Sequence, residues 1–328
     1  MGAVRRVLFL AAAVAALTIS IPATGHASTA PVTASLGRHF MPTLPEVKAA
    51  QTHPEDCVLP IVVSVVCAGV GTPMSSGGGP IQSAPAVYIV FWGWNGRDPS
   101  GEGPYQQAFF NGAGGSHWNS SQTQYCDPTT NLGLTCPAGS VHVGNPTGLL
   151  KGTWSDNTNA VPAHPDDSAI QAEAARAAAF FGNTTAASNA STQYVIDTPQ
   201  GNSTTGFGTQ WCAYHGAASS SAGTLSYTDF PYITDAGGSC GQNFVNSGSA
   251  GLLDGVSIVG GHEFAESETD PVPPSGWTDT IGAETGDKCA WISFGPGSSA
   301  DVTLPTGTFA VQSLWSNNAN SGLGGCVI

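Results

Sequence analysis

Residues 252–271 read LLDGVSIVGGHEFAESETDP, and this stretch decides how the whole chain is interpreted. It predicts a helix, for which Asp254 is the nearest candidate N-cap. Pro271 sets the end, because the residue before a proline avoids helical geometry. Gly260 and Gly261 each weaken a helix interior by roughly 1 kcal/mol relative to alanine. Close approach of a packing neighbour or of a ligand is a physical reason for glycine at such positions.

One face of this helix carries a histidine and carboxylates. At about 100° per residue, His262 and Glu266 lie about 40° apart. Asp270 shares their face, Glu263 flanks it, and Phe264 points toward the expected core. Side chains one helical turn apart are neighbours, so His262 and Glu266 can reach the same ion.

The region around the helix is strongly acidic. Eight of the 22 acidic residues lie between positions 254 and 287, an interval without lysine or arginine, and Lys288 is the only base nearby. Crowded carboxylates repel, so some must take up a proton or find a cation, and a bound metal ion is the natural counter-charge. The alternative is a solvated acidic surface on which screening keeps the repulsion small. The acidic residues are Asp254, Glu263, Glu266, Glu268, Asp270, Asp279, Glu284 and Asp287.

Zinc is the ion that these side chains favour, since catalytic zinc commonly takes three protein ligands and a water. His262 and Glu266 supply two ligands, and Asp287 in the string ETGDKC is the first choice for the third. Glu284 and His215 are further candidates, although His215 also fits a hydrogen-bonded strand histidine. Calcium is the alternative ion because most of the candidates are carboxylates, but it would leave His262 without a role.

Glu263 follows His262 directly, as the general base does in H-E-x-x-H enzymes. The helix therefore bears a remote resemblance to zincin-like metallopeptidases, from which it departs because Glu266 stands where the second histidine would be. The resemblance implies a zincin-like fold and Glu263 as the residue that takes a proton from water.

The N-terminus reads as a secretory signal over residues 1–27, with Arg5 and Arg6 before an apolar run. Residues 28–82 are interpreted as a leader or pro-segment followed by a Gly/Ser/Pro linker, and residues 83–328 as a single main domain. No later segment is apolar enough to cross a bilayer. We therefore expect a secreted, extracellular protein with no membrane association once the signal is removed.

Eight cysteines follow the signal, an even number that favours disulfides in an exported chain. Pairing of neighbours along the chain is the hypothesis. The pairs would be Cys57–Cys67, Cys126–Cys136, Cys212–Cys240 and Cys289–Cys326.

The charge balance argues against some partners. Without Arg5 and Arg6 the chain holds six basic and 22 acidic residues, a net charge of −16. Nucleic acids and anionic membranes need a basic surface, so neither is an expected partner. The sequence indicates no oligomeric state.

The remaining pattern predicts an α+β fold, a mixed β-sheet with packed helices that disulfides stabilise. Strands are expected at residues 86–94, 193–199, 210–216 and 224–233, and a short helix at 104–112. A longer helix should follow Pro165, with Ser168 and Gln171 as a capping box and Gly182 at its end.

Several strings resemble the plant phosphate-induced protein or EXORDIUM family and its exported bacterial relatives. They are AVYIVFWGW, CAYHG, PYITDAGGSCG, DGVSIVGGHEFAESETDP, ETGDKC and VQSLWSNNANSGLGGCV, in this order over residues 86–328. The spacing between Ser257 and His262 departs from the family core. The resemblance implies an extracellular or cell-wall protein.

Two functions follow from these observations. The first is an exported zinc hydrolase, a peptidase with His262, Glu266 and Asp287 as ligands and Glu263 as base, acting on a peptide or cell-wall polymer. The second is a non-enzymatic extracellular or carbohydrate-binding protein with a structural metal ion. Four tryptophans would then stack on sugars: Trp118, Trp154, Trp277 and Trp315.

Overall fold

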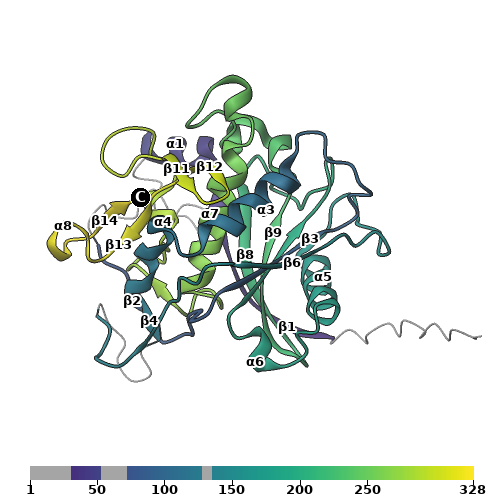
Figure 1. Ribbon diagram of the computed structural model, residues 1–328, viewed down its shortest axis with the longest axis horizontal. Helices are drawn as coiled ribbons and strands as arrows, with labels where there is room; N and C mark the ends of the chain where they lie inside the picture. The colour runs from purple at the N-terminus through teal and green to yellow at the C-terminus, as the bar shows by residue number, and fades with distance from the viewer. Residues whose placement is uncertain (1–30, 53–71, 128–134) are drawn as a thin grey trace, which may run out of the picture.

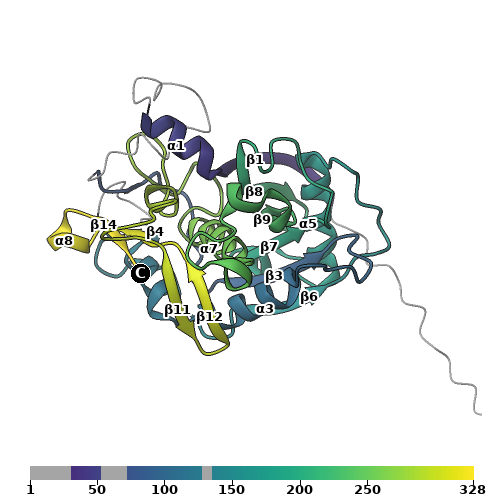
Figure 2. The ribbon, with the colours of Figure 1, turned by 90° about the horizontal axis from the view of Figure 1, so that it is seen from above.

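The computed structural model describes residues 31–52, 72–127 and 135–328 and has the α+β architecture that the sequence predicts. Its main element is a six-stranded mixed sheet in the order β1-β8-β9-β7-β3-β6, which Figure 2 shows from above. The strands β9, β7, β3 and β6 run parallel, whereas β8 is antiparallel to both of its neighbours. The six strands are β1 (Val32–Pro42), β3 (Ala86–Phe91), β6 (Leu150–Trp154), β7 (Thr192–Asp197), β8 (Trp211–Ser220) and β9 (Gly223–Phe230).

Smaller elements complete the described part of the chain. The helices are α1 (Leu44–Thr52), α3 (Glu102–Ala113), α4 (His117–Ser120), α5 (Asp167–Phe180), α6 (Ala186–Asn189), α7 (Asp254–Thr269) and α8 (Ala319–Gly322), with 3-10 turns that include η3 (Ile233–Cys240) and η5 (Asp287–Cys289). Short strand pairs are β2 (Ser75–Ser76) with β10 (Trp277–Thr278), β4 (Cys126–Asp127) with β5 (Val141–His142), β11 (Ala300–Leu304) with β12 (Gly307–Val311), and β13 (Leu314–Ser316) with β14 (Gly325–Val327).

Helices cover both faces of the main sheet. Helix α5 packs on one face, and α7 and α3 lie on the other, between the sheet and the β11–β12 hairpin (Figures 1 and 2). Each face has its own hydrophobic cluster, one including Ile170 and Tyr227 and the other including Phe109 and Phe264. Helix α7 is thereby enclosed, and all of its residues are buried.

The ends of two helices differ from the sequence prediction. Asp166, not Ser168, caps α5 by accepting the Ala169 N–H, while Ser168 donates its hydroxyl to Asp166. Asp254 is the first residue of α7 rather than its N-cap, and its carboxylate accepts the N–H groups of two residues of the preceding loop, Val245 and Asn246. At α5 a different carboxylate thus satisfies the helix N–H donor. At α7 the carboxylate of Asp254 is occupied by the loop, and no side chain caps the helix.

The glycines of α7 are explained by packing. A Cβ at Gly261 would lie 3.0 Å from the Trp118 ring and 3.2 Å from Phe109, so the helix approaches both rings closely. Gly260 faces Phe230 at ordinary contact distance. The neighbours of both glycines are therefore aromatic side chains of the core.

Three of the four expected disulfides are formed, and the fourth, Cys57–Cys67, lies outside the described residues. The bonds join Cys126 to Cys136, Cys212 to Cys240, and Cys289 to Cys326. The last of them ties the turn η5 to the C-terminal strand β14. No helix in residues 31–52, 72–127 and 135–328 is long and apolar enough to span a membrane.

Residues 32–42, which the composition places in the leader, form a strand of the main sheet. Strand β1 pairs antiparallel with β8 along its length, with His39 opposite His215. Met41 and Val47 of this N-terminal segment enter the main hydrophobic cluster. The described leader residues therefore pack against the predicted main domain.

Candidate metal centre

The structure brings all six candidate residues of the sequence to one buried place. Helix α7 supplies His262, Glu263 and Glu266 from the side that faces the sheet, and His215 meets them from β8. Glu284 and Asp287 approach from the loop after β10 and from the start of η5.

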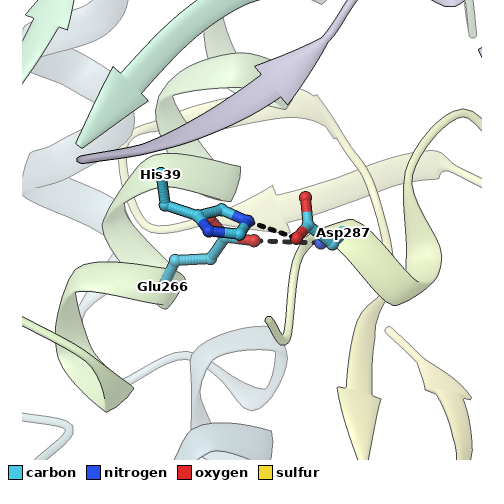
Figure 3. A group of neighbouring side chains, drawn as sticks. All are labelled: His39, Glu266 and Asp287. Carbon is cyan, nitrogen blue, oxygen red and sulfur yellow. Dashed lines mark hydrogen bonds and ion pairs between the residues drawn. The ribbon is translucent and has the colours of Figure 1, made fainter. Parts of the chain in front are cut away.

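A seventh residue, His39 of β1, completes the cluster, and the sequence interpretation did not include it. His39 Nε2 lies 2.5 Å from Asp287 Oδ2, and Nδ1 lies 3.4 Å from Glu284 Oε1. Figure 3 shows His39, Glu266 and Asp287 converging from β1, α7 and η5. His39 is the member with some exposure, 14% of its side chain, whereas Glu284 and Asp287 have none. His39 reaches the cluster because β1 pairs with β8, and no local sequence motif around residue 39 predicts that pairing.

Imidazoles and carboxylates alternate around the cluster, which we call the His/carboxylate ring. From Glu284 Oε2 the ring continues to His215 Nε2 at 3.5 Å, and His215 Nδ1 lies 3.5 Å from Glu266 Oε2. Glu266 Oε1 lies 3.1 Å from His262 Nε2, which is 3.7 Å from Asp287 Oδ1. The members of the ring are His39, Glu284, His215, Glu266, His262 and Asp287.

Glu266 is the central member because its two oxygens face different imidazoles. Two sets of potential ligand atoms share it, one with His39 and Asp287 and one with His215 and Glu284, and within each set the atoms lie within 4.8 Å of one another. Glu266 Oε1 also accepts the backbone N–H of Asp287 at 3.0 Å, which fixes the orientation of the carboxylate. Nitrogen and oxygen atoms of the ring therefore surround a common space.

Many buried polar atoms of the cluster, and one of Asp270 at the end of α7, have no hydrogen-bond partner. They are His215 Nε2, His262 Nε2, Glu263 Oε1, Glu266 Oε2, Asp270 Oδ2, Glu284 Oε1, Glu284 Oε2 and Asp287 Oδ1. A buried polar atom without a partner costs about 1–3 kcal/mol, and more when it is charged. Buried nitrogen and oxygen atoms without partners call for an explanation, and a bound cation is one that fits their gathering in one place.

The carboxylates of the cluster are crowded enough to resist ionisation. Burial raises the pKa of Glu263 well above its ordinary value, and the charges of Glu266 and Asp287 raise it further. Burial and the charges of Asp270 and Glu266 do the same to the pKa of Glu284. Burial also raises the pKa of Asp270, to about 6.

The imidazoles respond in different directions. Burial, which alone lowers the pKa of His39, is outweighed by the charge of Asp287, so that its pKa rises to about 9. Burial also lowers the pKa of His262, but the charges of Glu266 and Asp287 raise it more, so the pKa of His262 is raised. Burial, together with the charges of His39 and His262, moves the pKa of His215 well below its ordinary value. His215 is thus neutral, the form in which an imidazole binds metals.

Asp287 is the carboxylate best able to stay ionised. Burial alone would raise its pKa, but the charges of His39 and His262 hold that pKa below its ordinary value. Lys288, the nearest base in sequence, turns away from the ring to Asp279 at 2.8 Å and over the Trp315 ring at 4.3 Å. The carboxylates of the cluster are therefore not balanced by Lys288.

Two neighbours hold the ring in shape. Gln312 Oε1 lies 3.2 Å from His262 Nδ1, and Gln312 Nε2 donates to the carbonyl of Gly286 at 2.8 Å. A Cβ at Gly286 would stand 2.7 Å from His262 Nδ1 and 3.0 Å from Glu266 Oε1, so only glycine leaves room for the ring. A partner on the outer nitrogen of a histidine is typical of metal-ligating imidazoles.

The donor set fits zinc better than calcium. Three imidazoles stand among the candidate ligands, and imidazole nitrogen suits zinc and other transition metals, whereas calcium takes oxygen ligands. Carboxylates at 3.1–3.7 Å from the histidine nitrogens supply the negative charge that zinc sites also use.

The tryptophans expected to stack on sugars are mostly buried. Trp118, Trp277 and Trp315 are at most 2% exposed, and each donates its indole N–H within the protein. Trp154 is half-buried and stacks on Phe180 at 4.4 Å between ring centroids. The tryptophans thus offer little open stacking surface.

No family model, no curated protein and no solved structure matches the chain, so the chemistry of the site rests on its own geometry.

Proposed function

We propose that the protein is an exported metal-dependent hydrolase whose zinc ion binds in the His/carboxylate ring and whose substrates are peptides or peptide-containing polymers. The observation that carries this proposal is the ring itself, in which histidine and carboxylate atoms without partners gather in the core. His262, Glu266 and Asp287 are the proposed primary ligands, with His215 and Glu284 beside them.

Glu263 is proposed as the general base. Its carboxylate lies beside the ring, with Oε2 at 3.2 Å from His215 Nδ1 and Oε1 without a partner. A raised pKa, which burial causes here, makes the ionised carboxylate a stronger base, and this suits a group that takes a proton from water and returns it to a leaving amine. A bound zinc ion would supply polarisation of the scissile carbonyl and acidification of water.

Export is part of the proposal. Three disulfides among the described residues indicate an oxidising compartment, in agreement with the signal sequence expected at residues 1–27. An extracellular hydrolase of peptides or wall polymers is also in keeping with the resemblance to the EXORDIUM family and, more remotely, to zincin-like enzymes.

The burial of the ring favours a second candidate, a structural ion in a non-enzymatic protein. His215, His262 and Glu266 have no exposed side-chain surface, and structural zinc sites are closed whereas catalytic sites keep an open position. The two candidates differ in the role of Glu263, which a structural site does not need as a base.

Metal analysis and one substitution separate the candidates. The purified protein should contain zinc in stoichiometric amount, and His262→Ala should lose it. Glu263→Gln should keep the zinc but lose cleavage of a peptide library by on the order of 100-fold or more. Unchanged cleavage in Glu263→Gln would refute the assigned base, and a zinc-containing wild type that cleaves nothing would favour the structural ion.

A further inference from the structure

We propose that strand β1 occupies the binding position of an extended peptide substrate along the edge of β8, so that the chain's own residues 39–41 cover the catalytic centre. This inference rests on the proposed function, because it names the substrate geometry and the regulation of the same site. It assigns the edge of β8 as the substrate-binding element and residues 31–52 as a removable cover.

The first support is the place of β1 in the sheet. It lies at the outer edge, next to β8 (Figure 2), and residues 33–36 are exposed. Most of β8 is buried. Without β1, therefore, β8 becomes the edge strand, and its free N–H and C=O groups would accept another extended chain. Adding a strand to such an edge is a recurring way in which proteins bind peptides.

The second support is where β1 crosses the centre. Successive side chains of a strand point to opposite faces, and His39 and Met41 point to the face of α7. His39 reaches Asp287 and Glu284, and it stands opposite His215, whose Nδ1 lies 3.2 Å from Glu263 Oε2. The backbone between His39 and Met41 thus passes beside the proposed base.

The third support is the nature of the remaining contacts. On the other face Arg38 pairs with Asp167 at 3.7 Å, and Phe40 packs on Tyr214 at 4.9 Å between ring centroids. The main chain of β1 also pairs with β8 from Val32 to Pro42, a contact that accepts many sequences, while Met41 fills a fully buried position. The substrate class is therefore an extended peptide with an apolar side chain at the Met41 position.

Cleavage of the folded full chain tests the inference. A recognition sequence for a site-specific protease is inserted after Thr52, and a control chain carries the same sequence between Phe294 and Gly295, in a loop where Phe294 is 86% exposed. After cleavage of the metal-loaded protein, gel filtration and mass spectrometry measure whether residues 31–52 leave, and circular dichroism follows the fold of the remaining body.

Three results are expected from the chain cut after Thr52. Residues 31–52 separate from a body that stays folded. A chelator then removes the metal faster by on the order of tenfold or more, equivalent to about 1.4 kcal/mol of lost protection. A labelled peptide VTASLGRHFMP binds the body, measured by fluorescence anisotropy. The His39→Ala peptide binds on the order of tenfold more weakly, while the Ser35→Ala peptide, changed at an exposed position, binds like the original.

Two results would overturn the inference. In the first, residues 31–52 stay bound after cleavage and the chelator removes the metal as slowly as from the loop-cut control. This result would show that β1 is a permanent part of the fold. A body that unfolds when they leave would do the same. A protein that contains no metal would instead refute the proposed function. The release of residues 31–52 and the binding of the peptide would still test whether β1 can be replaced by another strand.

Discussion

His39 and His215 stand directly opposite each other in the β1–β8 ladder, with their ring centroids 5.9 Å apart. One residue lies in the segment that the composition assigns to a leader, and the other lies in β8, the second strand of the main sheet. Their meeting closes the His/carboxylate ring, because each imidazole lies within 3.5 Å of a different oxygen of Glu284.

Replacement of Glu266 should weaken metal binding most. The Glu266→Gln protein keeps the side-chain shape but loses the charge between His215 and His262, and we expect metal affinity to fall by 10–100-fold or more, in the range seen for perturbed metal sites. Competition with a chromogenic chelator measures it. Glu268→Gln is the control, because Glu268 is equally buried in α7 but accepts from Asn119 instead of facing the ring. Equal losses in both variants would contradict the central role of Glu266.

A methyl group at position 286 should push the His262 ring aside. Gly286 has helical backbone angles, φ −75° and ψ −45°, so alanine fits the backbone there and only the contact with His262 and Glu266 opposes it. Gly286→Ala should lower stability by about 1–3 kcal/mol through overpacking and reduce metal affinity. At Gly238 nothing lies within 4 Å of an added Cβ, so Gly238→Ala should leave both quantities unchanged. Urea unfolding and chelator competition give the two readouts.

The metal-free protein should lose stability as the pH rises. The folded state raises the pKa of Asp270 from 3.8 to about 6 and that of His39 from 6.5 to about 9. Both groups hold protons more tightly in the folded than in the unfolded protein, so their contribution is complete at low pH. It is lost between about pH 4 and 6 for Asp270 and between about pH 6.5 and 9 for His39, each on the order of 3 kcal/mol.

The comparison with metal-loaded protein isolates this effect. Buried carboxyls outside the ring, such as Glu102 and Asp229 with pKa values of about 7, act equally in both forms. The gain in Tm on adding zinc should therefore grow from pH 5 to pH 8 in calorimetric scans. The lowered pKa values of Asp287 and His215 act in the opposite sense, Asp287 only below about pH 4 and His215 only below about pH 6.5, so the net growth should be clearest from pH 6.5 to pH 8. A gain in Tm that shrinks from pH 5 to pH 8 would contradict the expectation that the ion relieves the repulsion among the carboxylates.

Loss of the disulfide nearest to η5 should affect the metal centre as well as stability. Cys289 follows Asp287 by two residues and is bonded to Cys326. The Cys289→Ser/Cys326→Ser protein should lose about 2–4 kcal/mol of unfolding free energy and bind metal more weakly, because Asp287 is held less firmly. The control, Cys126→Ser/Cys136→Ser, should lose stability but keep its metal affinity. Equal metal affinities in the two variants would show that the Cys289–Cys326 bond is not needed to position η5.

The sequence predicted the parts of the site that depend on local spacing. A one-turn separation places His262 beside Glu266 in any helix, and Pro271 fixed where α7 ends. Neighbour pairing predicted the three described disulfides, because cysteines close in sequence meet at low entropic cost of loop closure.

The parts that depend on strand register were not predictable. His39 reaches the ring through its position opposite His215, and one step of register would turn it to the α5 face, where Arg38 and Phe40 lie. The helix caps failed for a related reason: Asp166 and Ser168 both suit an N-cap by type, and the tertiary fit selected Asp166. Five of the six members of the ring were therefore among the candidates taken from the sequence, and His39 was the one that was missed.

The enclosure of α7 has a consequence for hydrogen exchange. A helix without a solvent face cannot fray locally, so its amides exchange with deuterium only through the largest opening of the protein. In a native-state exchange experiment the amides of residues 258–266 should thus be among the slowest in the chain. Their exchange rate would measure global unfolding, whereas the exchange rate of the β1 amides would measure the separation of residues 31–52 from β8.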